Sequence, residues 1–248
     1  MKLSETLQKP LLRIPASYQS SFNWSVYDDL ERRFGNQQPR GGVVFKTTFK
    51  LVNYHPSCTR CHYSFELDTY GRGCLHNCQY CYAKEQLTQH GFWNRPFPFP
   101  VDIAKVIAIM ATVFDTDRPS KWRSILEKRI PLRIGSMSDA FLYMDRKYGV
   151  TAELLRVLKH YRYPYIIFTR SDLVAEKPYL DLLDPELAVV QMSLSGDNAT
   201  LTQQLEPGAP SPQKRFEALK RLNERGIRTA IRINPLFPEY PDGYYSQP

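Results

Sequence analysis

The chain has 248 residues and a formal net charge of +8, and 42% of its residues are hydrophobic and 23% charged. This composition is ordinary for a globular protein. No apolar stretch approaches the roughly 20 residues that a membrane-spanning helix needs, so we expect no membrane partner. The first 15 residues lack the apolar core of a secretory signal, which predicts a cytoplasmic protein. The basic excess suits a nucleic acid partner or, equally well, a generic soluble surface.

Residues 1–62 predict an irregular N-terminal extension, with a short helix over Asp28–Phe34 and a strand over Val43–Val52. From residue 63 strands alternate with helices. The predicted strands are Tyr63–Tyr70, Pro131–Gly135, Tyr165–Thr169, Leu187–Leu194 and Arg228–Ile233. The predicted helices are Val101–Phe114, a helix capped by Thr151 and ending near Tyr161, Val174–Leu183, and one that Ser211 and Pro212 open and Gly226 ends. The last of these helices should bury Phe216, Leu219 and Leu222.

Strands separated by helices of this length form parallel βαβ units. The predicted fold class is therefore α/β, a partial (β/α) TIM-type barrel over residues 63–236, with residues 237–248 as a tail. A closed barrel needs more units than the sequence supplies before Pro248. We expect either an incomplete chain or a short, open barrel.

The five cysteines all lie between Cys58 and Cys81. A disulfide framework would spread its cysteines along the chain, so the clustering favours metal or iron–sulfur ligation. Cys74, Cys78 and Cys81 follow the spacing C-x3-C-x2-C, directly after the first predicted barrel strand. Three thiolates bind three irons of a [4Fe–4S] cubane and leave the fourth iron open to chelate S-adenosylmethionine.

Two alternatives to the cluster stay open. A zinc site is the first, because Cys58 and Cys61 supply a second pair of thiols, near His55 and His62. Buried free cysteines are the second. Cys58 and Cys61 alone cannot complete a four-ligand site, and they fit a small structural metal site, a second cluster, a redox pair or free thiols.

The other strand ends should complete the site, because active sites of such barrels lie at the carboxyl ends of the strands. The candidate cofactor-binding residues there are Gly135, Ser136, Ser138 and Asp139 after the second strand, Arg170 after the third, Ser193 and Ser195 on the fourth, and Ile233 on the fifth. The backbone and hydroxyls after the second strand suit the methionine ammonium group, and Arg170 suits the methionine carboxylate. Ser193 and Ser195 share a face and suit the ribose, and Ile233 suits the adenine. Ordinary turns, helix caps and barrel core are the alternatives, and core is favoured for Ile231.

The run from Tyr70 to Pro235 resembles the spore photoproduct lyase-like branch of the radical S-adenosylmethionine superfamily, which is also labelled DNA repair photolyase-like. The resemblance rests on GRGCLHNCQYCYA, on SMSDAF, on TRSDL and above all on LEPGAPSPQKRFEALKRLNERGI. It implies a partial barrel, one [4Fe–4S] cluster, S-adenosylmethionine, and an electron donor such as flavodoxin or ferredoxin. It also adds Tyr80 and Tyr82, beside the third cysteine, to the candidate cofactor site.

One departure concerns the substrate. Spore photoproduct lyase returns a hydrogen atom through a cysteine, and no cysteine follows Cys81 here. A tyrosine such as Tyr143 is one substitute. The sequence therefore predicts an enzyme that cleaves S-adenosylmethionine to a 5′-deoxyadenosyl radical, lyase-like or modifying nucleic acid or peptide. The competing hypotheses are a zinc-dependent nucleic-acid-binding module and an inactive fragment of a larger enzyme.

Overall fold

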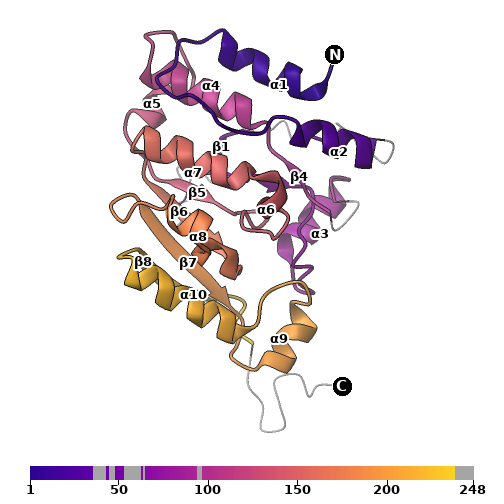
Figure 1. Ribbon diagram of the computed structural model, residues 1–248. Helices are drawn as coiled ribbons and strands as arrows, with labels where there is room; N and C mark the ends of the chain where they lie inside the picture. Colours follow the sequence, from indigo (N-terminus) through magenta and orange to yellow (C-terminus); the bar gives the residue numbers. More distant parts are fainter. Residues whose placement is uncertain (36–42, 45–47, 53–62, 64, 94–96, 238–248) are drawn as a thin grey trace.

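The computed structural model describes residues 1–35, 43–44, 48–52, 63, 65–93 and 97–237 (Figure 1). Cys58 and Cys61 lie outside the described residues, so their predicted roles stay predictions. The division into an extension, a barrel and a tail also stays a prediction. No helix in the described ranges combines the length and the apolar character needed to cross a bilayer.

The centre of the molecule is a six-stranded sheet in the order β1-β2-β5-β6-β7-β8. Its strands are β1 (Lys50–Leu51), β2 (Phe65–Leu67), β5 (Leu132–Ile134), β6 (Tyr165–Thr169), β7 (Ala188–Leu194) and β8 (Arg228–Ile233). Only β1 pairs antiparallel, and β2 to β8 are parallel. Within the described chain the sheet does not close on itself, which confirms an α/β fold with a partial barrel. Since five strands run the same way, their carboxyl ends meet at one edge.

Helices cover one face of this sheet. The main ones are α4 (Ile103–Phe114), α7 (Val150–His160), α8 (Lys177–Leu180) and α10 (Pro212–Glu224), which lie across the strands in Figure 1. Helix α1 (Leu3–Leu12) packs on α4, and α2 (Val26–Phe34) lies beside α1. Smaller elements complete the chain: a β3–β4 pair (Tyr70–Gly71 and Phe99–Pro100), α3 (Tyr82–Gln89), α5 (Arg123–Leu126), α6 (Asp145–Tyr148), a 3-10 helix η2 (Asp172–Ala175) and α9 (Ala199–Leu205).

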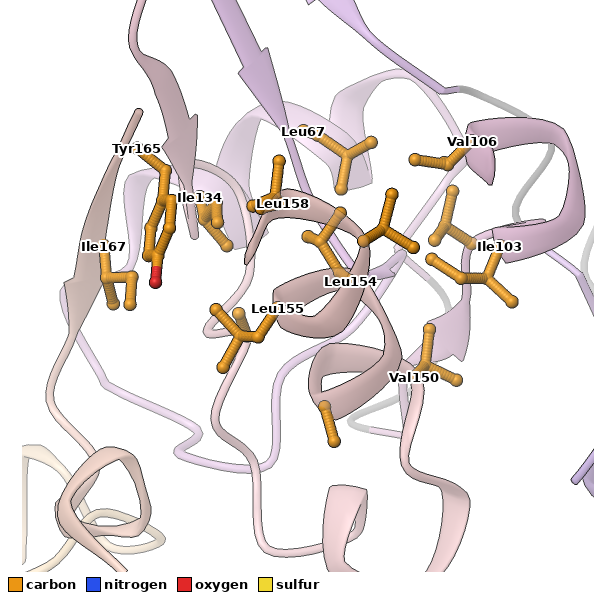
Figure 2. Packing of buried hydrophobic residues seen from close by; sticks show 14 of the residues in the cluster. Leu67, Ile103, Val106, Ile134, Val150, Leu154, Leu155, Leu158, Tyr165 and Ile167 are labelled. Carbon is orange, nitrogen blue, oxygen red and sulfur yellow. The ribbon is translucent and has the colours of Figure 1, made fainter. Parts of the chain in front are cut away.

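The core lies between these helices and the sheet. Leu154, Leu155 and Leu158 of α7 are fully buried against Ile134 and Ile167 of the strands, as Figure 2 shows. Burying one such side chain contributes roughly 1.5–3 kcal/mol. The helix-facing positions of β7 alternate with half-buried ones, so the opposite side of the strand faces the barrel interior. The core therefore fixes which side chains reach that interior.

Most predicted elements of the barrel are present, and two strands, β6 and β8, have the predicted bounds. The predicted strand over Val43–Val52 is reduced to β1 in the described residues. The predicted strand Tyr63–Tyr70 is divided into β2 and β3, because the Asp68 carboxylate accepts hydrogen bonds from the backbone of Ser136 and Met137 and turns the chain there.

Two predictions about helices were wrong. The helix over Val174–Leu183 is instead η2 followed by α8, because Pro178 has no N–H to donate to the Val174 carbonyl. Thr151 does not cap α7. Its hydroxyl donates to the Ala140 carbonyl, and the buried Asp145 carboxylate accepts from the first backbone amides of the helix instead.

Two predictions about burial were also wrong. Phe216 is 44% exposed, although Leu219 and Leu222 are buried as predicted. Ile231 is 51% exposed rather than core, because β8 is the edge strand of the sheet and no further described element covers its outer side.

Candidate functional site

A cavity of about 400 Å³ lies at the carboxyl edge of the parallel strands. The three motif cysteines line it together with Tyr80 and Tyr82. The strand-end residues that line it are Gly135, Ser136, Ser138, Asp139, Arg170 and Ser193. Three further lining residues, Arg133, Phe168 and Arg232, lie within the strands. Its size is in the range of small-molecule and cofactor sites.

The loop that carries the cysteines is folded by its own backbone. Asn77 adopts a left-handed conformation with φ of 49°, which asparagine tolerates, and its N–H donates to the Cys74 carbonyl. The Cys81 Sγ accepts from the Lys84 N–H at 3.4 Å and so caps α3.

The segment after α9 holds the same loop from the other side. The Gln79 N–H donates to the Leu205 carbonyl at 2.8 Å, and the Gly208 N–H donates to the His76 carbonyl at 3.0 Å. A Cβ atom built on Gly208 would lie 1.9 Å from the Leu75 carbonyl oxygen. Only glycine therefore allows this close approach of the two backbones.

The three thiols fit a metal cluster better than a solvent-exposed role. Burial raises the pKa of the Cys74 thiol to about 12, with a further rise from Asp139, and burial raises that of Cys78 to about 11. Without a metal these sulfurs therefore keep their protons, and a bound cation is what would stabilise the thiolates.

The geometry bears on the type of metal site. Of the residues that the structure describes, no three His, Cys, Asp or Glu side chains converge on one ion. A cubane does not need such convergence, because each cysteine binds a different iron, whereas a tetrahedral zinc ion does. The three motif cysteines, which line one cavity, are the described residues that could hold a cubane.

His76, between Cys74 and Cys78, is buried and ties the loop to the strand ends. Its Nε2 lies 3.1 Å from an Asp139 carboxylate oxygen and its Nδ1 lies 3.1 Å from the Gly208 carbonyl oxygen. Both ring nitrogens therefore lie within hydrogen-bond distance of an oxygen. Burial alone would raise the pKa of Asp139, but the charge and hydrogen bond of His76 outweigh this effect and lower it to about 2.

A second buried carboxylate is in contact with Tyr80. Glu206, which is fully buried, accepts hydrogen bonds from Tyr80, from the Ser195 hydroxyl at 2.5 Å and from the buried Arg215. The Arg170 Nε lies 3.6 Å from the same carboxylate. Burial opposes the charge of Glu206, but Arg170 and Arg215 together lower its pKa below the usual value.

The structure brings all but two of the predicted site residues to the cavity wall. Ser195 lies behind it, bound to Glu206. Ile233 is 61% exposed and is not a lining residue, because alternation along β8 directs its neighbour Arg232 inward instead. Tyr143, suggested as a hydrogen-atom relay, donates its hydroxyl to Asp172 at 2.6 Å and does not line the cavity.

Sequence reasoning missed Glu206, Arg215, Arg133, Phe168 and Arg232. The first two belong to the LEPGAPSPQKR stretch, which the resemblance singled out without giving it a role. Arg232 could have been found from Ser193, because the two residues are partners across β7 and β8 and so share a face.

Comparisons with known proteins bear on the fold. No family model matches the chain. Three uncharacterised proteins are similar to it. One from Methanocaldococcus jannaschii is 27% identical over 176 residues, which are 70% of this chain and 61% of the relative. One from Mycobacterium tuberculosis is 22% identical over 205 residues (81% of this chain and 58% of the relative), and one from Acidianus two-tailed virus is 25% identical over 178 residues (67% of this chain and 54% of the relative). The chain thus spans only part of the length of these relatives.

Solved structures of spore photoproduct lyase share the fold. A cysteine-to-serine mutant matches with a TM-score of 0.59 at 16% identity, covering 88% of this chain and 66% of that chain. A mutant with bound S-adenosylmethionine and dinucleoside spore photoproduct matches with a TM-score of 0.58 at 15% identity, covering 87% and 66%. The chain therefore shares the fold of spore photoproduct lyase.

Proposed function

We propose that the protein is a radical S-adenosylmethionine enzyme whose [4Fe–4S] cluster is held by Cys74, Cys78 and Cys81. One observation carries the proposal: three thiols of a C-x3-C-x2-C loop line the same cavity as the carboxyl ends of the parallel strands. When bound, the cluster supplies the electron that cleaves S-adenosylmethionine to a 5′-deoxyadenosyl radical. Spore photoproduct lyase, which shares the fold, supports this assignment.

The residues around the cavity have chemistry suited to the cofactor. The Arg170 Nε is buried and makes no hydrogen bond among the described residues, although Glu206 lies 3.6 Å from it, and we assign the Arg170 guanidinium to the methionine carboxylate. Gly135 has φ of 87° and approaches the Phe168 carbonyl so closely that a Cβ would lie 2.2 Å from it. The Ser136 hydroxyl donates to Asp68 and the Ser138 hydroxyl donates to the Gly73 carbonyl, so both oxygens keep lone pairs that can accept from the ammonium group. We assign the backbone of Gly135 to the same group and Ser193 to the ribose.

Two partners belong to the proposal. A one-electron donor such as flavodoxin or ferredoxin reduces the cluster. Nucleic acid is the substrate class that we propose, because the chain carries a net charge of +8 and a polyanion is attracted to such a surface.

Anaerobic reconstitution tests the proposal. We expect the parent protein to bind about four irons and four sulfides and to form 5′-deoxyadenosine with dithionite. Cys78→Ala should lose both properties, because two thiolates do not hold a cubane. Cys58→Ala is the matched control, since it removes a thiol outside the motif and should keep both.

The zinc hypothesis predicts the opposite pattern. Purified protein would then be colourless and hold zinc without sulfide, and Cys58→Ala would lose metal as Cys78→Ala does. Equal amounts of 5′-deoxyadenosine from Cys78→Ala and from the parent protein would also refute the cluster assignment.

A further inference from the structure

The cavity wall is strongly cationic. Four of its lining side chains carry positive charge, Lys84, Arg133, Arg170 and Arg232, and Asp139 is its one lining carboxylate. Asp139 is already paired with His76, and Arg170 with Glu206. Arg133 is ion-paired with the buried Glu66, whereas Arg232 has no ion-pair partner among the described residues.

Both arginines are held against one aromatic ring. The guanidinium carbon of Arg232 lies 4.3 Å from the centroid of the Phe168 ring, and that of Arg133 lies 5.6 Å from the same centroid. The Tyr63 ring packs edge-to-face with the Phe168 ring, and the two ring centroids lie 5.2 Å apart. Gln191 donates a hydrogen bond to the Tyr63 hydroxyl. One ring of β6 thus contacts a cation from β5 and a cation from β8.

The hydrogen-bonding capacity of this pair is not satisfied within the described chain. The Arg133 Nε is buried and has no hydrogen-bond partner there, although the same guanidinium is ion-paired with Glu66. Arg232 has no carboxylate within ion-pair distance in the described ranges, and its guanidinium lies over the Phe168 ring. A buried donor without a partner, such as the Arg133 Nε, is rare in folded proteins, and an anionic ligand oxygen would satisfy it.

We propose that Arg133 and Arg232 form the subsite that receives a phosphodiester group of a nucleic acid substrate. This inference rests on the proposed function, since it places the substrate in the cofactor cavity. A phosphodiester has charged oxygens that accept charge-assisted hydrogen bonds from a guanidinium group, and a phosphate polymer presents one at every linkage, so each arginine can bind one. The net positive charge of the chain attracts such a polyanion.

Binding of a fluorescently labelled single-stranded DNA to the reconstituted protein tests the subsite, with a methylphosphonate strand of the same sequence as the uncharged probe. Arg232→Gln should weaken DNA binding about tenfold, as expected for one charge-assisted hydrogen bond. It should also reduce the slope of log affinity against log salt by about 0.7. Its affinity for the methylphosphonate strand should equal that of the parent.

Arg133 needs a double variant, because Arg133→Gln alone leaves the buried Glu66 without its arginine partner. Glu66→Gln/Arg133→Gln removes both charges and should weaken DNA binding by a similar factor. Arg162→Gln is the matched control. It removes the same charge from an exposed arginine that precedes the amino end of β6, at the opposite edge of the sheet, and should bind DNA like the parent.

Three results would overturn the subsite: unchanged DNA affinity in Arg232→Gln, an equal loss in Arg162→Gln, or an equal loss of S-adenosylmethionine binding, which would assign the arginines to the cofactor. Stronger competition by an acidic peptide than by DNA would overturn the choice of substrate. Formation of 5′-deoxyadenosine is measured separately. A parent protein that binds DNA through Arg232 but forms none would refute the proposed function and leave the subsite intact.

Discussion

Replacing Glu206 by glutamine tests whether the segment after α9 holds the cluster loop through charge. The substitution is nearly isosteric, so it keeps the packing but removes a fully buried negative charge. Arg215 is equally buried, and its other hydrogen bonds go to the carbonyls of Pro210 and Ser193. Glu206→Gln therefore leaves a buried guanidinium with no carboxylate that the structure shows.

The expected cost follows from this burial. Breaking a buried ion pair by removing one partner costs about 3–5 kcal/mol, because the remaining charge is left uncompensated. Against a total stability of roughly 5–15 kcal/mol, this is a large fraction. The cluster loop should also loosen, because Tyr80 loses the carboxylate to which it donates. We expect reduced iron retention as well as reduced stability.

Anaerobic urea unfolding, followed by circular dichroism, measures the stability, and iron analysis after desalting measures cluster retention. Glu127→Gln is the matched control, because Glu127 is 53% exposed and pairs with Arg123 on the surface of α5. Such exposed pairs contribute about 0.2–1 kcal/mol. A loss of less than 1 kcal/mol in Glu206→Gln, with full iron content, would refute the role given to this carboxylate.

Three further predictions concern the same site and the core. Gly208→Ala should abolish iron binding in reconstitution, because its Cβ would collide with the Leu75 carbonyl, and iron content equal to the parent's would contradict this. Stability should be fully present above pH 4 and lost as pH falls toward 2, since the pKa of Asp139 is lowered from 3.8 to about 2 in the folded state. This lowering corresponds to about 2 kcal/mol, which urea titrations of Asp139→Asn should no longer show. Leu158→Ala should cost about 2–5 kcal/mol in the same assay with iron binding preserved in the folded protein, and a cost below 1 kcal/mol would argue against the packing in Figure 2.

The sequence predicted those parts of the molecule whose signal is local. The strand Tyr165–Thr169 is a short apolar run between polar residues, and Ser211 with Pro212 marks the start of α10. The cysteine spacing likewise depends only on neighbouring residues. The strand and the helix start need no knowledge of the rest of the fold, which is why these two predictions agree with the structure.

The errors have tertiary causes. Thr151 has a side chain suited to capping, but Asp145 reaches the same amides from a preceding helix. Phe216 has the helical spacing of a core residue, yet it lies beyond the edge strand, where no described element covers it. Propensity describes what a residue can do, and the neighbours present in the fold decide which option is realised.

The site residues that sequence reasoning missed also depend on contacts between distant parts of the chain. Glu206 lies more than 120 residues after Tyr80, and its role appears only when the segment after α9 is folded against the cysteine loop. A charged residue in that stretch is, by sequence alone, a solvated side chain. In the structure it is buried with Arg215, and the two compensate each other's charge beneath the loop. The motif therefore supports the cysteine loop: its glycine permits the backbone contact, and its ion pair contacts Tyr80 and Arg170.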